Sequence, residues 1–357
     1  MNIIHGLMSF GALFLTLPTA FAQPIQGTSF SHLNWEVYCS NTGTCRAAGY
    51  QDDNHQDYPA SILLTRKAGA QQALQVDFAL SNNDQAFDQN KLKNIHFYIN
   101  DQDYGVVSID GSEAPLIGTL NIKQRNGLQQ QAKQNAKIVF KNAHYTWQIS
   151  DAGMTAALLK MDDFQKRTGT VGALVKRGKA SESKALTAQP KLMIRKVKTA
   201  EKPYLTLQPQ SKPYANLHKI LMAAKPSMKD SGDFCEGIYT EKGAQSQAIE
   251  LYSLSNHKVL ATTTCWRGAY NEGYGAWVID RSLKGKATFV TESASDFGNG
   301  EIGSAQKGRG IGDCWAMSAW IWNGQVFVQS LDRWSGMCKG IAAGGVWNLD
   351  RIESVVR

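Results

Sequence analysis

Six cysteines constrain this chain more than any other feature, because their number is even and each has a possible partner nearby in the sequence. No C-x-x-C spacing of the kind that holds zinc is present. An even count in an oxidising compartment indicates disulfides, although six cysteines allow many pairings. We expect neighbours in the sequence to pair, and we expect neither a metal ion nor a cofactor. The predicted disulfides are Cys39–Cys45, Cys235–Cys265 and Cys314–Cys338.

The first 22 residues have the pattern of a secretory signal peptide. Leu7 to Leu17 is almost wholly apolar, and Ala20-Phe21-Ala22 fits the small-x-small cleavage pattern, although no Lys or Arg precedes the apolar run. That run is too short for a stable bilayer anchor, and no later stretch is long enough. We predict cleavage after Ala22, export to the periplasm and no transmembrane segment in the mature chain.

Length and charge divide the mature chain into two domains. Its size suggests roughly two domains by the usual length prior. The formal net charge is +8, and residues 176–230 hold 13 Lys and Arg against 3 acidic residues, together with five prolines. Prolines and concentrated charge are typical of a linker. We predict an N-terminal β-rich domain over 23–178, a basic linker over 179–230 and a Trp-rich β domain over 231–357.

Period-two alternation predicts strands in the first domain, and one amphipathic helix closes it. We expect Asp151 to cap this helix and Gly169 to end it. The apolar face contains Met154, Leu158 and Met161, which we interpret as packing on the sheet. The side chains predicted on the wetter face are Lys160, Asp163, Lys166 and Arg167.

The second domain also has short strands separated by Gly and Asn turns, which favours a sandwich or barrel. Asn323-Gly324 suits a two-residue type I′ turn, which would place Trp322 opposite Gln325 and Trp320 opposite Phe327. We also expect Trp320 and Trp322 to face opposite sides of their strand, which would leave one ring outside the core as an aromatic binding surface. The predicted fold class is therefore mainly β, with two sandwich-like or barrel-like domains.

Four motifs occur in order along the chain, namely WEVYCSNTGTCRAAGY, AALLKMDDFQKRTGTVGALVKRG, CWRGAYNEGYG, and GRGIGDCW with the distal CKGIAAGGVWNL. Together they resemble the bacterial exported proteins grouped as domain-of-unknown-function family 1176. The resemblance implies a Gram-negative periplasmic setting and no established activity. The W-x-x-x-C opening and the closing helix of the first domain are also similar to the invasion-associated locus B proteins.

Two segments place Arg beside glycine next to a cysteine, and we take them as the candidate binding site. Glycine allows close backbone approach, and Arg can bind a carboxylate or phosphate with two hydrogen bonds. The same residues also fit structural ion pairs and tight turns. If the segments converge, they form a polar pocket walled by tryptophans. The candidate residues are Trp266, Arg267, Tyr270, Asn271, Arg309, Asp313 and Trp315.

No hydrolase or P-loop motif is present, so we assign no catalytic residue. We predict a binding protein for a cell-envelope component, whether a glycan, a lipid headgroup or a protein. The linker offers a contact for an anionic surface, and export argues against nucleic acid as the partner. The alternative is a cell-wall hydrolase with paired carboxylates. Its candidate acids are Glu272, Glu292, Glu301 and Asp313.

Overall fold

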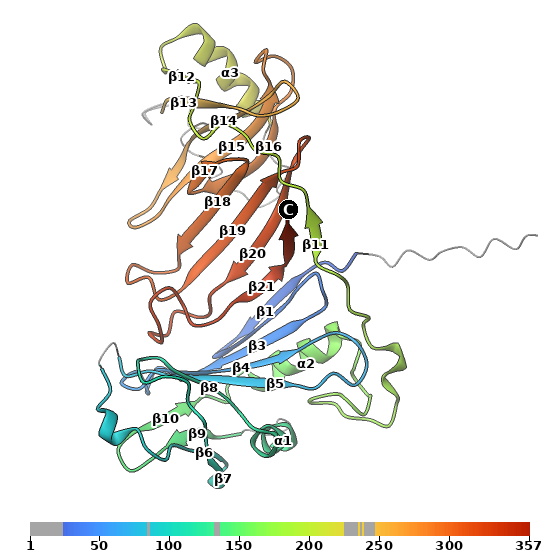
Figure 1. The fold of residues 1–357 in the computed structure, drawn as a ribbon, viewed down its shortest axis with the longest axis vertical. Coiled ribbons are helices and arrows are strands. Elements are labelled where there is room, and N and C mark those ends of the chain that lie inside the picture. The colour runs from blue at the N-terminus through green and yellow to red at the C-terminus, as the bar shows by residue number, and fades with distance from the viewer. Residues whose placement is uncertain (1–23, 84–85, 132–135, 225–234, 236–237, 239–246) are drawn as a thin grey trace, which may run out of the picture.

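The computed structural model describes residues 24–83, 86–131, 136–224, 235, 238 and 247–357. The fold is mainly β, as predicted, and its mostly antiparallel sheets form an N-terminal and a C-terminal unit along the long axis of the molecule (Figure 1). The predicted signal peptide and its cleavage site lie outside the described residues. Within the described ranges, no helix has the length and apolar character needed to span a membrane.

The N-terminal unit contains a six-stranded and a four-stranded sheet. The first has the order β1-β2-β3-β4-β5-β8, with β1 (Thr28–His32), β2 (Trp35–Cys39), β3 (Cys45–Tyr50), β4 (Ala60–Arg66), β5 (Gln75–Leu80) and β8 (Leu116–Thr119). The second has the order β10-β9-β6-β7, with β6 (His96–Ile99), β7 (Gln102–Val106), β9 (Ile138–Lys141) and β10 (Thr146–Ile149). The other elements are η1 (Gln89–Lys91), α1 (Ile122–Gln131) and α2 (Met154–Phe164).

Aromatic side chains fill the space between these two sheets. The Phe78 ring lies 4.8 Å from that of Phe140, which in turn lies 5.0 Å from that of Phe97 (centroid distances), and all three are fully buried. Trp147 is also buried, and its indole Nε1 donates a hydrogen bond to the Ser81 carbonyl at 2.7 Å. Each buried ring removes a large apolar area from water, so this cluster stabilises the packing of the two sheets.

The amphipathic helix exists, with its apolar face buried as predicted, but its ends differ from the prediction. Gly153, in the left-handed region at φ 100°, precedes the helix, and Asp151 contributes only its backbone carbonyl, to the Met154 N–H. A side chain at Gly153 would collide with the His32 carbonyl, so glycine is required there. The helix ends at Phe164, before Gly169.

Two buried ion pairs lie at the end of this helix. Arg167, predicted on the wetter face, is buried and pairs with Glu182. Asp162 is fully buried, pairs with Arg66 at 2.7 Å and accepts the N–H groups of Leu174 and Val175. A buried charge requires such a complete set of partners, which draws the chain after the helix back onto the sheet.

The C-terminal unit contains two five-stranded antiparallel sheets and a parallel strand pair. The first sheet has the order β12-β13-β14-β15-β16, with β12 (Leu205–Leu207), β13 (Ile249–Ser253), β14 (Lys258–Arg267), β15 (Glu272–Asp280) and β16 (Thr288–Ala294). The second runs from β17 to β21, with β17 (Asp296–Gly298), β18 (Glu301–Lys307), β19 (Trp315–Trp322), β20 (Phe327–Trp334) and β21 (Leu349–Ile352). The remaining elements are η2 (Glu182–Lys184), β11 (Leu192–Ile194), α3 (Lys212–Ala223) and β22 (Ser354–Val356).

The β19–β20 hairpin forms, but its predicted register is wrong. Trp322 pairs with Phe327 and Trp320 with Gln329, so the connection has four residues instead of two. The Asn323 side-chain oxygen accepts the N–H groups of Gln325 and Val326, both at 2.9 Å. These side-chain hydrogen bonds compete with a type I′ turn, and the loop is therefore longer than predicted.

The expectation that Trp320 and Trp322 face opposite sides is also wrong. Residues two apart on a strand share a face, and both rings pack on one apolar cluster with Ile302. Trp322 is fully buried, whereas Trp320 is only half-buried. Neither ring therefore lies outside the core, although Trp320 is partly accessible.

The basic segment contributes strands to the sheets of the C-terminal unit. β11 pairs in parallel with β22, and β12 pairs with β13 at the edge of the first sheet. The same segment forms α3, whose Leu217 and Leu221 are buried beneath that sheet. The described part of the segment, up to Ala224, is therefore integrated into the fold, which a free tether would not be. The domain boundaries themselves stay predictions.

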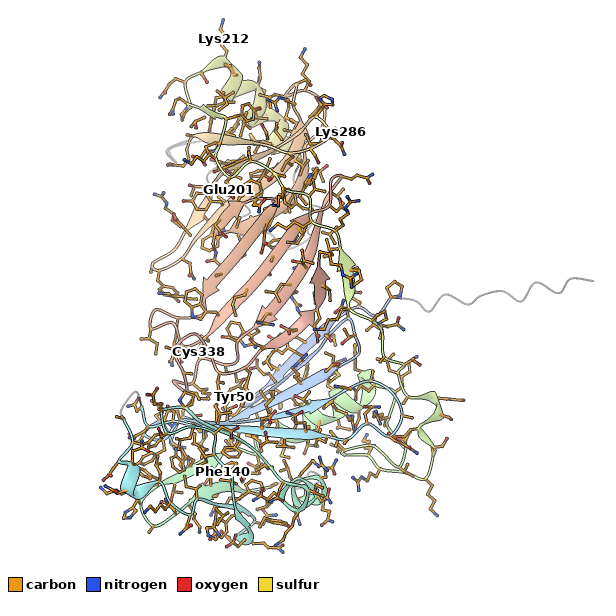
Figure 2. All side chains as sticks on the ribbon, viewed as in Figure 1. Tyr50, Phe140, Glu201, Lys212, Lys286 and Cys338 are labelled. Atoms are coloured by element: carbon orange, nitrogen blue, oxygen red, sulfur yellow. A yellow bond between two sulfur atoms is a disulfide. The ribbon has the colours of Figure 1, made fainter. Side chains whose placement is uncertain are left out.

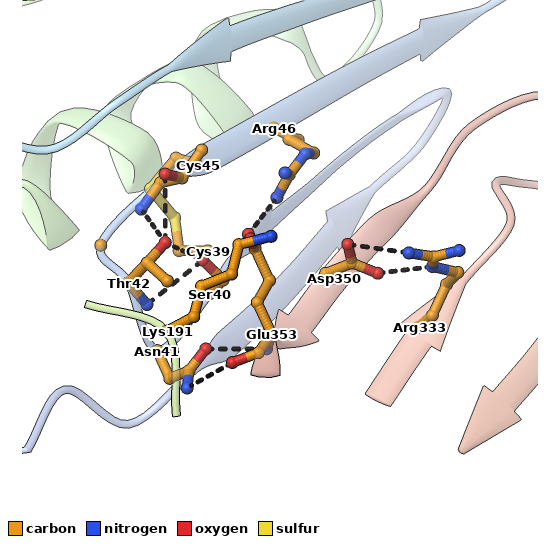
Figure 3. A network of polar contacts seen from close by, with 12 residues as sticks. Cys39, Ser40, Asn41, Thr42, Cys45, Arg46, Lys191, Arg333, Asp350 and Glu353 are labelled. Atoms are coloured by element: carbon orange, nitrogen blue, oxygen red, sulfur yellow. Dashed lines mark hydrogen bonds and ion pairs between the residues drawn. A yellow bond between two sulfur atoms is a disulfide. The ribbon is translucent and has the colours of Figure 1, made fainter. Parts of the chain in front are cut away.

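The two units share a packed and hydrogen-bonded interface. Tyr50 lies at this junction with the loop that carries Cys338 (Figure 2), and Tyr50, Ile341 and Leu349 belong to one buried apolar cluster. Asn41 exchanges two hydrogen bonds with the backbone of Glu353, at 2.8 and 3.2 Å (Figure 3). The Glu353 carboxylate also pairs with Arg46 at 3.1 Å.

Glu36 is the most unusual charged residue of this interface, because it is only 3% exposed. The Tyr50 hydroxyl and the Met337 N–H both donate to its carboxyl oxygen. Burial raises the pKa of Glu36 to about 7, although the bonds from Tyr50, Met337 and Trp334 act in the opposite direction.

We expect the free energy of unfolding to fall as pH rises from 4.5 to about 7. A glutamate of the unfolded chain loses its proton near 4.5, whereas folded Glu36 retains it to about 7. Linkage then gives a change on the order of 3 kcal/mol. Urea unfolding across this interval should show a smaller change in Glu36→Gln, whereas Glu113→Gln, at an exposed position, should behave as the parent chain. An unchanged pH slope in Glu36→Gln would contradict this assignment.

Replacing Asp162 by Ala should lower the free energy of unfolding by about 3–5 kcal/mol, because it leaves the buried Arg66 guanidinium without its anionic partner. Asp163→Ala is the matched control, since that neighbouring side chain is exposed and should change stability by less than about 0.5 kcal/mol. Urea unfolding of both variants measures the difference. Similar losses in the two would show that the buried pair has no special role.

Candidate functional site

The two candidate segments converge, since the β14–β15 turn docks on the end of β18. Asn271 Nδ2 donates to the Lys307 carbonyl at 2.8 Å, and its Oδ1 accepts the Lys307 N–H at 2.9 Å. The Tyr270 hydroxyl lies 3.4 Å from the Gly308 carbonyl. The Asn271 side chain thus makes the two hydrogen bonds to Lys307 that a neighbouring strand would otherwise make. Its polar atoms are therefore used within the fold.

Arg309 and Asp313 form a second closed arrangement beside the Cys314–Cys338 disulfide. The guanidinium donates to both carboxylate oxygens, at 2.7 and 2.6 Å, and the Gly340 N–H donates to Asp313 at 2.7 Å. Burial acts to raise the pKa of Asp313, but the bonds from Arg309 and Gly340 outweigh it, and the pKa is lowered. This pair fixes the loop before β19.

The two tryptophans do not wall a common pocket. A bulge between Thr264 and Trp266 places the Trp266 ring on the cluster under α3, against Gly273. Trp315 instead donates from Nε1 to the Gly312 carbonyl at 2.8 Å. The structure therefore brings Tyr270 and Asn271 to the segment that carries Arg309, and it leaves Trp266 elsewhere.

Arg267 lines a cavity of about 420 Å³ on the other face of the same sheet. Its guanidinium lies 3.3 Å from the Glu272 carboxylate. The volume falls within the usual range of small-molecule sites. We call this space the acidic cavity, because its charged lining residues are Arg267 and three carboxylates, those of Glu250, Glu272 and Asp296.

Two matched Glu–Tyr pairs lie in the acidic cavity. Tyr252 donates to Glu250 at 2.7 Å from β13, and Tyr274 donates to Glu272 at 3.1 Å from β15. Burial, followed by the neighbouring carboxylate, raises the pKa of both tyrosines, so both phenols stay protonated donors at neutral pH. Sequence reasoning missed Glu250 and both tyrosines. The available signal was the Glu-x-Tyr spacing, which puts both side chains on one face of a strand.

The four acids named for hydrolysis do not gather in one place. Glu272 lines the acidic cavity, whereas Glu301 pairs with Lys196 at 2.8 Å and Asp313 with Arg309. Glu292 accepts the Cys235 N–H on the opposite face of β16, where burial raises its pKa.

Asp313, Cys314 and Cys338 are the closest approach to a metal-binding cluster among the described residues, with ligand atoms within 4.8 Å of one another. Both sulfurs belong to a disulfide with an S–S distance of 1.96 Å. A disulfide offers no thiolate, so this cluster does not fit a metal ion.

All three predicted disulfides are present, namely Cys39–Cys45, Cys235–Cys265 and Cys314–Cys338. Fold and site together define a β-rich, disulfide-bonded protein with a polar cavity between the sheets of its C-terminal unit. The family described as proteins of unknown function (DUF1176) matches residues 29–352, and the chain belongs to this family. The predicted resemblance to that family is confirmed, while the resemblance to invasion-associated locus B proteins stays a prediction.

One curated relative supports the same assignment. The uncharacterized protein YpfG of Escherichia coli K12 is 24% identical over 357 residues, which cover 90% of this chain and 94% of that protein. No solved structure matches the chain. The relative extends along nearly the whole chain, but its name assigns no activity.

Asn271→Ala should lower the free energy of unfolding by about 1–2 kcal/mol, because the Lys307 N–H and C=O lose their partner in a half-buried position. Tyr270→Phe is the matched control, since it removes only one long hydrogen bond from an exposed side chain. Urea unfolding compares the two. A greater loss in Tyr270→Phe would show that Asn271 is not the main contact between the segments.

Proposed function

We propose that this chain is an exported, periplasmic protein that binds a cell-wall component without catalysis. The sequence of residues 1–22 and the three disulfides support export. The single observation that carries the binding role is the acidic cavity, in which matched Glu–Tyr pairs from two strands face a common space. Trp266 and Trp315 do not line this cavity, and neither do the other candidate residues Tyr270, Asn271, Arg309 and Asp313.

The lining of the acidic cavity favours a ligand that carries a free amino group and hydroxyls. Three carboxylates outnumber the single guanidinium, so the lining is negative within a chain of positive net charge. An ammonium group would gain charge-assisted hydrogen bonds from Glu250 and Glu272. The tyrosine rings and the hydroxyls of Thr262 and Thr264 suit the apolar faces and hydroxyls of a sugar. A glycan with free amino groups fits this description.

The proposal is tested by calorimetric titration with glucosamine oligomers, and with their N-acetylated forms as the uncharged comparison. We expect the free amine to bind and the acetylated form to bind at least about tenfold more weakly, a difference that should shrink with salt. Glu250→Gln combined with Glu272→Gln should remove the preference for the amine. Glu301→Gln is the control, because that carboxylate lies outside the acidic cavity. Equal binding of both oligomers, or of neither, would contradict the proposal.

The alternative, a cell-wall hydrolase, predicts turnover of peptidoglycan that Glu272→Gln abolishes. Glu272 is the acid among the four that lines the acidic cavity, and Glu250 and Asp296 are the candidate partners in the same lining. Release of soluble fragments by the parent chain, lost in this variant, would replace binding by catalysis as the function.

Contact of the basic segment with an anionic surface is a further part of the proposal. Two of its lysines already have protein partners, since Lys191 pairs with Glu353 and Lys196 with Glu301. Lysines that remain exposed, such as Lys198 and Lys212, are available to an anionic surface. Such a contact is electrostatic and weakens as salt screens it.

A further inference from the structure

A second cavity, of about 450 Å³, lies on the other side of the junction between the two five-stranded sheets. β15 and β16 form one wall with Val278 and Val290, and the β19–β20 hairpin forms the other with Trp320, Val326 and Phe327. We call this space the basic cavity, because its charged lining residues are Lys258 and Lys286.

The wall of the basic cavity is apolar and partly open to solvent. Val278, Val290, Trp320 and Phe327 all belong to the apolar cluster between the sheets, so the cavity is an accessible edge of a packed core. Val326, at the tip of the hairpin, is 51% exposed. Exposed apolar area of this kind beside an open cavity is typical of a surface that contacts an apolar partner.

The positive charge of the basic cavity favours a partner that carries a negative charge. Its described lining contains two lysines and no acidic residue. Lys258 lies 4.0 Å from Asp280, at the limit of an ion pair, and both side chains are more than 40% exposed. Lys286 is exposed at the upper end of the molecule, on the loop before β16 (Figure 2). Both ammonium groups can therefore reach an anion at the mouth of the cavity.

We propose that the basic cavity binds a single-chain anionic amphiphile, with the chain against Trp320, Val278 and Phe327 and the head group between Lys258 and Lys286. Charge complementarity selects the anion, and the half-buried indole gives the chain an apolar surface that is already formed. The residues involved are different from those of the acidic cavity, so the inference does not rest on the proposed function.

Aromatic side chains that line the two cavities pack against each other. The Phe297 ring, which lines the acidic cavity, lies 6.2 Å from the Phe327 ring of the basic cavity, and Trp322 packs 5.2 Å from Phe327 (centroid distances). The two sites therefore present opposite charges on either side of one apolar core. A ligand suited to one is electrostatically unsuited to the other.

The test is equilibrium dialysis of dodecanoate against the full chain, below the concentration at which dodecanoate forms micelles. Dodecyltrimethylammonium, dodecyl maltoside and acetate serve as the cationic, neutral and chain-free comparisons. We expect saturable binding of dodecanoate, weaker binding of the two other dodecyl compounds by roughly tenfold or more, and no binding of acetate. Equal binding of the anionic and cationic chains would overturn the proposal, because it would show a non-specific apolar surface.

Variants separate the head-group contact from the chain contact. Lys258→Gln with Lys286→Gln should weaken dodecanoate binding by roughly tenfold, as two exposed charge contacts are lost. Val326→Asp should weaken it also, because it places a like charge at the mouth from an exposed position that tolerates a polar side chain. Lys284→Gln is the control, since that lysine is exposed on the same loop but does not line the cavity. Unchanged binding in the double lysine variant would refute the site.

A second experiment, with lipid vesicles, distinguishes a phospholipid from a single-chain ligand. Flotation with phosphatidylglycerol vesicles should leave the protein unbound at a salt concentration where dodecanoate still binds. Vesicle binding without dodecanoate binding would overturn the single-chain proposal. Thermal unfolding of each variant without ligand checks that the fold is retained, and dodecanoate should raise the transition temperature of the parent chain and of Lys284→Gln.

Discussion

The structure depends on the docking of the last 25 residues against the outer face of the N-terminal sheet. β2 and β3 are buried on both faces, one by α2 and the apolar core of the N-terminal unit, the other by the segment between β20 and β21. Trp347 donates to Ser61 at 2.8 Å, and Tyr50 packs with Leu349. Without this cover, an apolar sheet face with a buried carboxyl group would be open to water. The two units therefore stabilise each other through this interface, despite separate cores.

Local features of the fold were predictable where a single physical pattern decides them. Period-two alternation predicted strands in the first domain, because half-buried strands require it. The disulfides followed from proximity in the sequence, and the apolar face of α2 from its period. Register and helix ends were not predictable in this way. The Asn323 side chain rearranged a turn, and the fold required glycine at 153 because of His32, far away in the sequence.

The candidate site was predicted only in part, because contacts between residues far apart in the sequence determine its local geometry. The two Arg-Gly segments do meet, yet Asn271 uses its polar atoms on the Lys307 backbone, and Asp313 uses its own on the Arg309 side chain and the Gly340 N–H. The bulge before Trp266 turns that ring away and leaves Arg267 facing the cavity. Glu250 and Tyr252 were overlooked because a Glu-x-Tyr spacing has no chemical meaning until a second such pair lies across the sheet.

The pairing of β11 with β22 has a consequence for the order in which the chain assembles. β11 ends at Ile194, yet its partner strand contains the third and second residues from the C-terminus, Val355 and Val356. During synthesis the N-terminal unit emerges complete while its outer sheet face still lacks the segment that covers it. Final assembly must wait until β22 is available, and the exposed strands are open to wrong pairings until then. The pairing of β11 with β22 therefore forms late, because β22 follows every other described strand in the chain.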